Sequence, residues 1–390
     1  MIKRFIFYKI DYTSFYKKCK QVVLEKDKAI YHLKQFKEEK KMKALVYDKP
    51  GRKFSGIREV PYPVCGDDDV IIKVMSASIC KGVEHDHDRE NVGTDLAVYP
   101  VTPGHEFSGY IEEIGKNVTK FQKGDRVCAD NTEYCGDCYY CRKEESNYCP
   151  TFGSLGHNID GGFAQFVRVK KEKVFPIPDS LSFNAAALGE PVACCLHAVD
   201  RCEVKYGDVV AVIGAGPMGL ILAQLLNHSN ASEVIMIAST QSKLDMARKM
   251  GIQNTILMDR KDYSVHTDKL KEKYPLGVDL IVDATGSVDV IRHSMTLLKK
   301  GGRLVQYAVV HSDEQVSLDP RLMFNNELTY TTSFCQSHNF GRAVEALNDG
   351  RVKGDLLVTH EYPLDQFYEA LDENVNNRDS IKVVIHPNNE

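Results

Sequence analysis

The sequence predicts an α/β protein in which a β-rich domain is followed by a nucleotide-binding domain with a doubly wound parallel sheet. From Met42 onward, short apolar runs alternate with turn residues, as in a β-rich domain. After Pro191, strands alternate with helical segments, which is typical of a parallel sheet covered by helices. A glycine-rich turn at residues 214–219 joins the first of these strands to a helix. With 390 residues, the chain is long enough for two domains that each bury a core.

The first 41 residues differ in composition from the rest of the chain. They contain twelve Lys or Arg residues against five Asp or Glu residues. The acidic residues disfavour a transit peptide. The segment also lacks the apolar stretch followed by small residues that marks a cleaved signal peptide. We interpret residues 1–41 as a basic extension, either an appended surface helix or an extension of the gene model. Met42 would make a natural start, because it opens a strand-like run.

Short apolar segments support the β-rich assignment. Residues 42–47 and 70–74 are strand-like, and residues 108–114 lead into a glycine-containing turn. A second turn, at residues 123–126, enters another strand. We place this domain at residues 42–192.

One short stretch holds four cysteines with the spacing C-x2-C-x2-C-x7-C, namely Cys135, Cys138, Cys141 and Cys149. Closely spaced thiolates can enclose a single tetrahedral Zn²⁺ without ligands from elsewhere. Two disulfides are the alternative, but the sequence has no secretory signal and the spacing is that of a metal knuckle. The pattern therefore predicts a closed structural zinc site.

A second set of metal-binding residue types is more dispersed. Cys80, His105 and Glu106 precede the knuckle, and Glu190 follows it. Taken alone, Cys80 or His105 would more often be a buried thiol or a hydrogen-bonded histidine than a ligand. Together with a closed zinc site, these four residues predict an open site for a catalytic zinc.

The nucleotide-binding domain is marked by a G-x-G-x-x-G motif between an apolar strand and a helix. Gly214 permits the tight turn, Gly216 allows a pyrophosphate to approach the backbone, and Gly219 allows the helix to pack closely on the strand. Pro217 and Met218 begin the helix whose N-terminus receives the phosphates. The motif predicts dinucleotide binding, and a glycine-rich turn without a ligand is the alternative.

The end of the next strand indicates which dinucleotide is bound. An Asp or Glu there would accept a hydrogen bond from the ribose 2′-hydroxyl of NAD and repel the additional phosphate of NADP. The chain has Ala238 in this place, followed by Ser239, Thr240 and Lys243, whose side chains can donate to a phosphate. We therefore predict NADP in preference to NAD, although no arginine, which binds phosphate as a fork, stands next to Ser239.

The overall composition excludes several partners. A net charge of −4 leaves no broad basic face for nucleic acid. We find no apolar run of about 18 or more residues, and therefore expect no membrane span. Twelve cysteines, four of them in a zinc knuckle, fit a reducing compartment, and we predict a cytoplasmic protein.

The order of these motifs resembles that of the zinc-containing medium-chain alcohol and polyol dehydrogenases. The similarity runs from Met42 to the C-terminus. It includes, in order, Cys80, Gly104-His105-Glu106, the four-cysteine knuckle, Asp160-Gly161-Gly162-Phe163, Glu190-Pro191 and the glycine motif. The pattern is similar to the sorbitol, xylitol and arabinitol type, in which Cys, His and Glu ligands replace the Cys, His, Cys set of simple alcohol dehydrogenases.

The resemblance implies a GroES-like catalytic domain, residues 42–192 and 333–390, and a Rossmann cofactor domain, residues 193–332, with the substrate in the cleft. It implies transfer of a hydride between a polyol or secondary alcohol and NAD(P), which gives the ketose or ketone. A zinc ion at the open position would lower the pKa of the substrate hydroxyl. Enzymes of this type are dimers or tetramers, so we expect a homodimer or homotetramer.

The residues after Cys80 depart from the family pattern. The family usually has Gly, then Ser or Thr, then Asp, whereas this chain has Lys81, Gly82 and Val83. In the family, the hydroxyl contacts the reacting oxygen and starts a proton relay, and the Asp braces the histidine ligand. His85 matches the family's histidine five residues after the cysteine, which keeps a relay through water or ribose open. A solvent-facing His85 is the alternative.

Two explanations remain for this departure. Either Glu84, His85 or Asp86 supplies the lost polar contacts, or proton transfer is poor and activity is slow or lost. We favour the first explanation, because the metal ligands and the cofactor turn are all present. The predicted catalytic residues are therefore Cys80, His85, His105 and Glu106. The alternatives to a polyol dehydrogenase are an enzyme of the same architecture acting on threonine or an aldose, and a non-catalytic NADP-binding protein.

Overall fold

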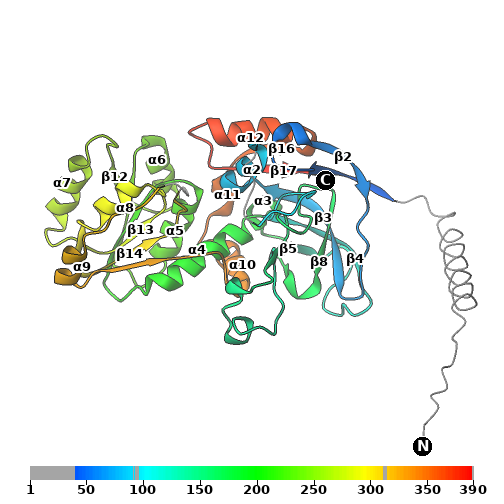
Figure 1. The fold of residues 1–390 in the computed structure, drawn as a ribbon, viewed down its shortest axis with the longest axis horizontal. Helices are drawn as coiled ribbons and strands as arrows, with labels where there is room; N and C mark the ends of the chain where they lie inside the picture. The colour runs from blue at the N-terminus through cyan, green and yellow to red at the C-terminus, as the bar shows by residue number, and fades with distance from the viewer. Residues whose placement is uncertain (1–39, 91, 93–95, 311–313, 389–390) are drawn as a thin grey trace, which may run out of the picture. The chain divides into compact units, whose positions relative to one another are not determined.

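The computed structural model describes residues 40–388, except residues 91, 93–95 and 311–313. Met42–Glu390 forms one compact unit, and the fold described below is the fold of that unit (Figure 1). Of the predicted basic extension, residues 1–39 lie outside the described residues. No helix in the described part of the chain is long and apolar enough to cross a bilayer.

The first sheet has the strand order β16-β17-β3-β4-β5-β9, with β8 paired to β3. Its longest strand, β3 (Asp69–Ser78), is almost entirely buried and pairs antiparallel with β4 (Phe107–Ile114). The other strands are β5 (Arg126–Ala129), β8 (Phe166–Lys170), β9 (Val174–Pro176), β16 (Val358–Pro363) and β17 (Lys382–His386). Because β17 pairs with β3, the C-terminal segment completes the sheet that the N-terminal half begins.

Smaller elements surround this sheet. Two-stranded sheets are formed by β1 (Lys41–Tyr47) with β2 (Ser55–Pro61), and by β6 (Thr132–Glu133) with β7 (Gly153–Ser154). The helices are α2 (Lys81–Asp88), α3 (Phe183–Ala186), α10 (Phe340–Asn348), α11 (Gly354–Leu357) and α12 (Phe367–Asn376). The strands predicted at residues 42–47, 70–74 and 108–114 are confirmed as parts of β1, β3 and β4.

The second sheet contains six parallel strands in the order β12-β11-β10-β13-β14-β15. They are β10 (Val209–Ile213), β11 (Glu233–Ala238), β12 (Asn254–Leu257), β13 (Val278–Asp283), β14 (Leu298–Gln306) and β15 (Thr329–Thr332). The helices between them are α5 (Pro217–Asn227), α6 (Gln241–Lys249), α7 (Ser264–Lys273), α8 (Val288–Ser294) and α9 (Pro320–Asn326) (Figure 1). The predicted doubly wound sheet is confirmed.

The central strands of this sheet are continuous apolar runs because helices cover both faces. The chain leaves β10 in one direction toward β11 and β12, and later returns on the other side of β10 as β13, β14 and β15. In open parallel sheets, the crevice at such a reversal of strand order binds ligands at the carboxyl ends of the strands. The glycine turn lies at the carboxyl end of β10, and therefore in that crevice.

Glycines are required in this turn by the backbone itself. Gly214 has a φ of +108°, which L side chains rarely adopt. A Cβ atom on Gly219 would lie 1.8 Å from the carbonyl oxygen of Gly214, so α5 can approach β10 only without a side chain there. Pro217 is the first residue of α5, where its missing N–H costs no helical hydrogen bond.

Helix α4 (Gly189–Cys202) connects the two sheets, and the predicted domain boundary after residue 192 lies inside it. The chain returns from the second sheet after Thr332, at the other predicted boundary. The returning segment, residues 333–339, contacts both α4 and the four-cysteine lobe. The Nδ2 atom of Asn339 donates to the carbonyl of Ala193 at 2.9 Å, and Nδ2 of Asn147 donates to the carbonyl of Phe334 at 3.3 Å.

Candidate active site

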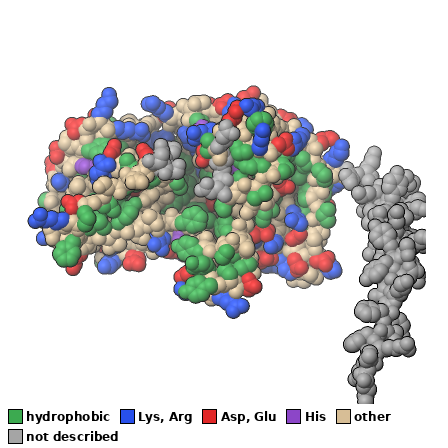
Figure 2. All heavy atoms as spheres, viewed as in Figure 1, with side chains coloured by type: hydrophobic (Ala, Val, Ile, Leu, Met, Phe, Trp, Pro, Cys, Tyr) green, Lys and Arg blue, Asp and Glu red, His purple; other side chains and the backbone are tan. Residues whose placement is uncertain are grey.

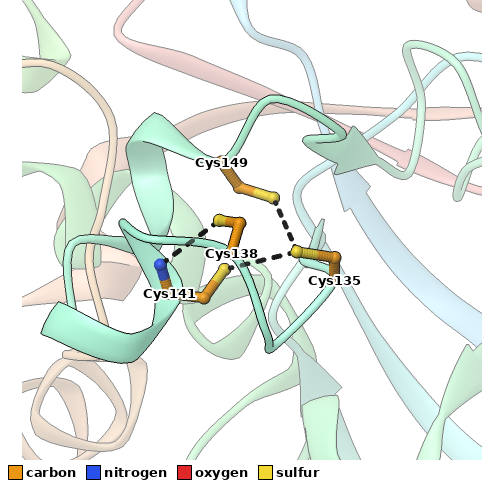
Figure 3. A group of neighbouring side chains, drawn as sticks. All are labelled: Cys135, Cys138, Cys141 and Cys149. Atoms are coloured by element: carbon orange, nitrogen blue, oxygen red, sulfur yellow. Dashed lines mark hydrogen bonds between the residues drawn. The ribbon is translucent and has the colours of Figure 1, made fainter.

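The structure brings the four cysteines of the knuckle together in a lobe between β6 and β7 (Figure 3). All four are free thiols, so no disulfide links them. The Sγ atom of Cys135 lies 3.9 Å from that of Cys141 and 3.6 Å from that of Cys149. Four thiolates at a Zn–S distance of about 2.3 Å around a tetrahedral ion would be about 3.8 Å apart. The lobe therefore fits a structural zinc ion closely.

The second group forms where two antiparallel strands meet. Cys80 follows the end of β3 and is the N-cap of α2, while His105 and Glu106 directly precede β4. Because Ala77 pairs with Phe107, the end of β3 lies beside the start of β4. Ligand atoms of Cys80, His105 and Glu106 lie within 4.8 Å of one another, and both His105 and Glu106 are buried.

Glu106 is held by a lysine from the far end of the chain. The Nζ atom of Lys382, on β17, lies 2.7 Å and 2.6 Å from the two carboxylate oxygens of Glu106. Both side chains are buried, so neither charge is stabilised by water. Burial opposes the charge of Lys382, yet the Glu106 carboxylate raises the lysine pKa above its usual range. The sequence offered no signal for this contact, because the two residues are 276 positions apart.

Glu84, in the first turn of α2, lies beside the histidine. Its Oε2 atom accepts a hydrogen bond from the backbone N–H of Cys80 at 2.7 Å, and its Oε1 atom lies 3.7 Å from Nδ1 of His105. Neither of the atoms in that second contact has a hydrogen-bond partner. Burial raises the pKa of Glu84 to about 8, and the His105 charge opposes this shift. Glu84 thus occupies the neighbourhood in which the family's Asp would brace a histidine ligand.

The donor set of this group fits a bound divalent cation. The half-buried thiol of Cys80 and two buried carboxylates, those of Glu84 and Glu106, are accompanied by one buried lysine. Burial, reinforced by Glu106, raises the pKa of the Cys80 thiol to about 11, so a thiolate at this position needs a cation beside it. Cys, His and Glu side chains are compatible with zinc, and the Nε2 atom of His105 lies 3.9 Å from Oε1 of Glu106, on the opposite side of the ring from Glu84.

Two predicted residues lie outside the group of three. Glu190, in the first turn of α4, accepts a hydrogen bond from Sγ of Cys194 at 3.1 Å. Burial raises the Glu190 pKa and the charge of His105 lowers it, so its carboxylate faces the same buried region. His85, on α2, is half-buried and is not part of the group.

The three residues after Cys80 have different surroundings. The Nζ atom of Lys81 donates to the carbonyl of Val375 at 3.0 Å, and Lys81 lines the cofactor cavity described below. Gly82 is exposed, and a Cβ atom built on it would meet nothing within 4 Å. Val83 is half-buried. The missing hydroxyl and carboxylate are therefore not replaced at positions 82 and 83.

A further histidine, His157, packs against the predicted ligand His105, with ring centroids 4.9 Å apart. Its Nδ1 atom shares a hydrogen bond with Oγ of Ser154 at 3.0 Å. Burial, with the charges of His105 and His87, lowers the His157 pKa to about 3, so this ring is neutral. Sequence reasoning missed His157, although it lies only three residues before the Asp160-Gly161-Gly162-Phe163 motif.

A cavity of about 1010 Å³ lies at the carboxyl ends of the parallel strands, and its lining includes Ile79 and Lys81, on either side of Cys80. Figure 2 shows the surface hollowed between the two domains, with Lys and Arg side chains along the hollow. Of the predicted cofactor-binding residues, Gly214, Gly216, Pro217, Ala238, Ser239, Thr240 and Lys243 line the cavity. Met218 and Gly219 do not line it, because they belong to the packed part of the turn. Sequence reasoning missed Arg260, which also lines the cavity.

Comparison with known proteins identifies the family. Residues 66–179 match the alcohol dehydrogenase GroES-like domain, and residues 217–349 match the zinc-binding dehydrogenase domain. D-arabinitol dehydrogenase 1 of Uromyces fabae is 36% identical over 348 residues, which cover 89% of this chain and 97% of that protein. D-arabitol-phosphate dehydrogenase of Enterococcus avium is 33% identical over 356 residues, which cover 90% of this chain and 99% of that protein. A zinc-binding dehydrogenase from Sinorhizobium meliloti, bound to NADP, has a TM-score of 0.82 at 29% identity, covering 89% of this chain and 100% of that chain.

The chain therefore belongs to the zinc-containing medium-chain dehydrogenase family. It is a zinc-dependent NAD(P) alcohol or polyol dehydrogenase, with a four-cysteine cluster and a separate Cys, His and Glu site. The predicted resemblance and the predicted combination of a GroES-like domain with a Rossmann domain are confirmed.

Proposed function

We propose that the protein oxidises a secondary hydroxyl of a polyol to a ketone and transfers the hydride to NADP, so that the polyol becomes a ketose. One observation carries this proposal. The Cys80, His105 and Glu106 group lies next to the dinucleotide cavity, because the neighbours of Cys80 on both sides line that cavity. When bound, zinc supplies the Lewis acidity that lowers the pKa of the substrate hydroxyl, and the nicotinamide accepts the hydride.

The side chains around the zinc ligands have positioning roles in this proposal. Glu84 would brace His105 through the Nδ1 side of the ring, and Lys382 would hold the Glu106 carboxylate in place. Glu190 would complete the site as a ligand or through a bridging water, since it lies outside the group of three. His85 remains the proposed residue for carrying the proton to solvent, because it is half-buried on the same helix as Glu84.

The proposed substrate class is a five-carbon polyol. Support comes from the relatives whose names specify D-arabinitol or D-arabitol phosphate, at 36% and 33% identity. The proposed preference for NADP is supported by the absence of an acidic residue after β11, where Ala238 is buried and Ser239 follows. Gly82 and Val83 favour the alternative of a non-catalytic NADP-binding protein, because they remove the hydroxyl and carboxylate of the family pattern.

The test of the proposed activity is the formation of reduced nicotinamide by zinc-loaded protein with NADP and, separately, with NAD. The substrates should include D-arabinitol, other pentitols and hexitols, D-arabinitol phosphate, simple secondary alcohols, threonine and aldoses. Turnover with a pentitol supports the proposal, and turnover only with threonine or an aldose would reassign the substrate. If no compound gives reduced nicotinamide, in protein that holds two zinc ions and binds NADP, the non-catalytic alternative would be favoured.

The cofactor preference has its own test in Ala238→Asp. A carboxylate at this position would accept a hydrogen bond from the ribose 2′-hydroxyl of NAD and repel the phosphate of NADP. We expect kcat/KM for NADP to fall by about tenfold or more while that for NAD is kept or rises, since placing two negative charges side by side costs on the order of a few kcal/mol. An unchanged ratio of the two kcat/KM values would contradict the proposed preference.

A further inference from the structure

The residues that follow β11 and β12, two neighbouring parallel strands, lie at the same part of the cofactor cavity. Ala238 at the end of β11 is in register with Leu257 at the end of β12. The backbone N–H of Met258 donates to the carbonyl of Ala238 at 2.9 Å, which extends this pairing by one residue. Ser239 and Arg260 therefore leave the sheet side by side, and both line the cavity.

Arg260 is held in a definite orientation by this neighbour. Its Nε atom donates to Oγ of Ser239 at 2.9 Å. Within the described part of the chain, no ion pair with a carboxylate engages Arg260, although Asp259 precedes it. The Oδ1 atom of Asp259 instead accepts from the backbone N–H of Lys261 at 2.8 Å. The two terminal nitrogens of the guanidinium thus remain available in an exposed side chain at the cavity wall.

A second cation lies close to Arg260. Lys243, on the first turn of α6, lines the same cavity and is half-buried. Burial and the positive charges of Lys81 and Arg260 lower the Lys243 pKa. Cations that repel one another at a cavity wall favour an anion between them. The start of α6 adds the positive end of a helix at Gln241.

We infer that Arg260, Ser239 and Lys243 form a binding site for a phosphomonoester, the 2′-phosphate of the adenosine half of NADP. The inference rests on the proposed function and assigns its cofactor preference to a residue that follows β12 rather than β11. A guanidinium with one edge held by Ser239 offers its remaining N–H groups to phosphate oxygens as a fork. The arginine that the sequence lacks beside Ser239 is thereby supplied 21 residues later.

The test uses two fragments that differ only in this phosphate, adenosine 2′,5′-bisphosphate and adenosine 5′-monophosphate. Their affinities for the zinc-loaded full chain are measured by calorimetry, without any need for turnover. We expect the wild-type protein to bind the bisphosphate more tightly. Arg260→Ala should weaken bisphosphate binding by about tenfold or more, as expected for the loss of charge-assisted hydrogen bonds, and leave the monophosphate unchanged. Arg260→Lys should lose part of this affinity, because a lysine has no fork.

Lys261→Ala is the matched control. It removes a positive charge from the residue next to Arg260, and the Lys261 side chain does not line the cavity. Equal weakening by Lys261→Ala would mean that only overall charge matters and would overturn the inference.

If Arg260→Ala weakened the binding of both fragments equally, the arginine would contact the adenine instead, which would also overturn the inference. If the wild-type protein preferred the bisphosphate and Arg260→Ala did not change this, the role of Arg260 would be wrong while the NADP preference stood. If the wild-type protein did not distinguish the fragments, the NADP preference itself would fall together with this site.

Discussion

Single charged residues decide how the proposed catalytic zinc site is held. Glu84 lies beside His105 although it stands four positions after Cys80. Helix α2 begins at Lys81, and its first turn brings position 84 back toward the predicted ligands. Lys382 reaches Glu106 from the last strand of the sheet. Both contacts are buried, where an uncompensated charge is costly. We therefore expect the proposed site to depend on Glu84 and Lys382, which lie outside the family's motif.

Glu84→Gln tests the brace. The amide keeps the shape of the side chain but cannot become the carboxylate that accepts a strong hydrogen bond from Nδ1 of a zinc-bound His105, so we expect zinc affinity at this site to fall by about 10- to 100-fold. The measurement is the zinc content per chain after dialysis against a weak chelator, together with kcat/KM. Asp86→Asn, on the same helix but half-buried and outside the ligand group, is the control and should keep both zinc ions. Full zinc retention and full activity in Glu84→Gln would show that Glu84 does not support the site.

At the level of elements, the dinucleotide turn combines two glycines with different physical requirements. Gly219 is needed for packing, because a Cβ there would collide with the carbonyl oxygen of Gly214. Gly216 has an ordinary φ of −72°, and a Cβ there would meet nothing within 4 Å. The packing of α5 on β10 therefore requires Gly219, whereas the space beside Gly216 is open to the cavity.

The pair Gly219→Ala and Gly216→Ala separates these requirements. We expect Gly219→Ala to destabilise the fold by about 1–3 kcal/mol or more, as overpacking does. Gly216→Ala should change the free energy of unfolding by less than about 1 kcal/mol and weaken NADP binding, because its methyl group would occupy the space of the pyrophosphate. Thermal melts and NADP titrations check both. Equal melting temperatures for the two variants would contradict this division of roles.

A buried histidine between α7 and α8 should make the nucleotide-binding domain sensitive to acid. His266 on α7 is buried, packs against Tyr263 and His293, and leaves its Nδ1 atom without a partner. Burial, with the charge of His293, lowers its pKa from 6.5 to about 4. Below pH 6.5 the unfolded chain takes up a proton that the folded chain does not. Stability should therefore fall as the pH drops from 6.5 toward 4, and this contribution should be constant above 6.5.

His266→Phe checks this expectation, because it keeps a ring in the packing and removes the titrating group. Urea midpoints at several pH values between 4 and 7 should depend less on pH in His266→Phe than in the wild type. His228→Phe, which changes an exposed histidine, is the control. The same acid dependence in His266→Phe as in the wild type would mean that other groups cause it.

At the level of the whole molecule, the four-cysteine lobe supports the segment that returns from the Rossmann domain. Asn147 donates to Phe334, and Nε2 of His338 shares a hydrogen bond with Oγ of Ser146 at 2.9 Å. Ser146 and Asn147 lie between the third and fourth cysteines of the lobe. The order of this loop, and with it the position of the returning segment, should therefore depend on the bound structural zinc.

Cys138→Ser tests this dependence. It removes one ligand of a site that has no spare ligand, so we expect the chain to lose one zinc ion and the melting temperature to fall by about 5 °C or more. Metal analysis and differential scanning calorimetry provide the measurements. Cys65→Ser is the control, since this free, partly buried cysteine lies outside both metal groups. Retention of two zinc ions in Cys138→Ser would show that the knuckle does not bind zinc with all four cysteines.

The sequence by itself determined the structural zinc lobe, the dinucleotide turn and the two-domain architecture of this protein, because local patterns encode them. The cysteine spacing, the strand–glycine turn–helix unit and the change of texture after Pro191 each depend on residues close in the chain, where backbone geometry allows few outcomes. The family follows from their order. Tertiary structure alone decided which side chains serve these sites. Lys382 and Arg260 reach their partners across 276 and 21 positions, because sheet pairing brings distant strand ends together and no local pattern encodes that pairing.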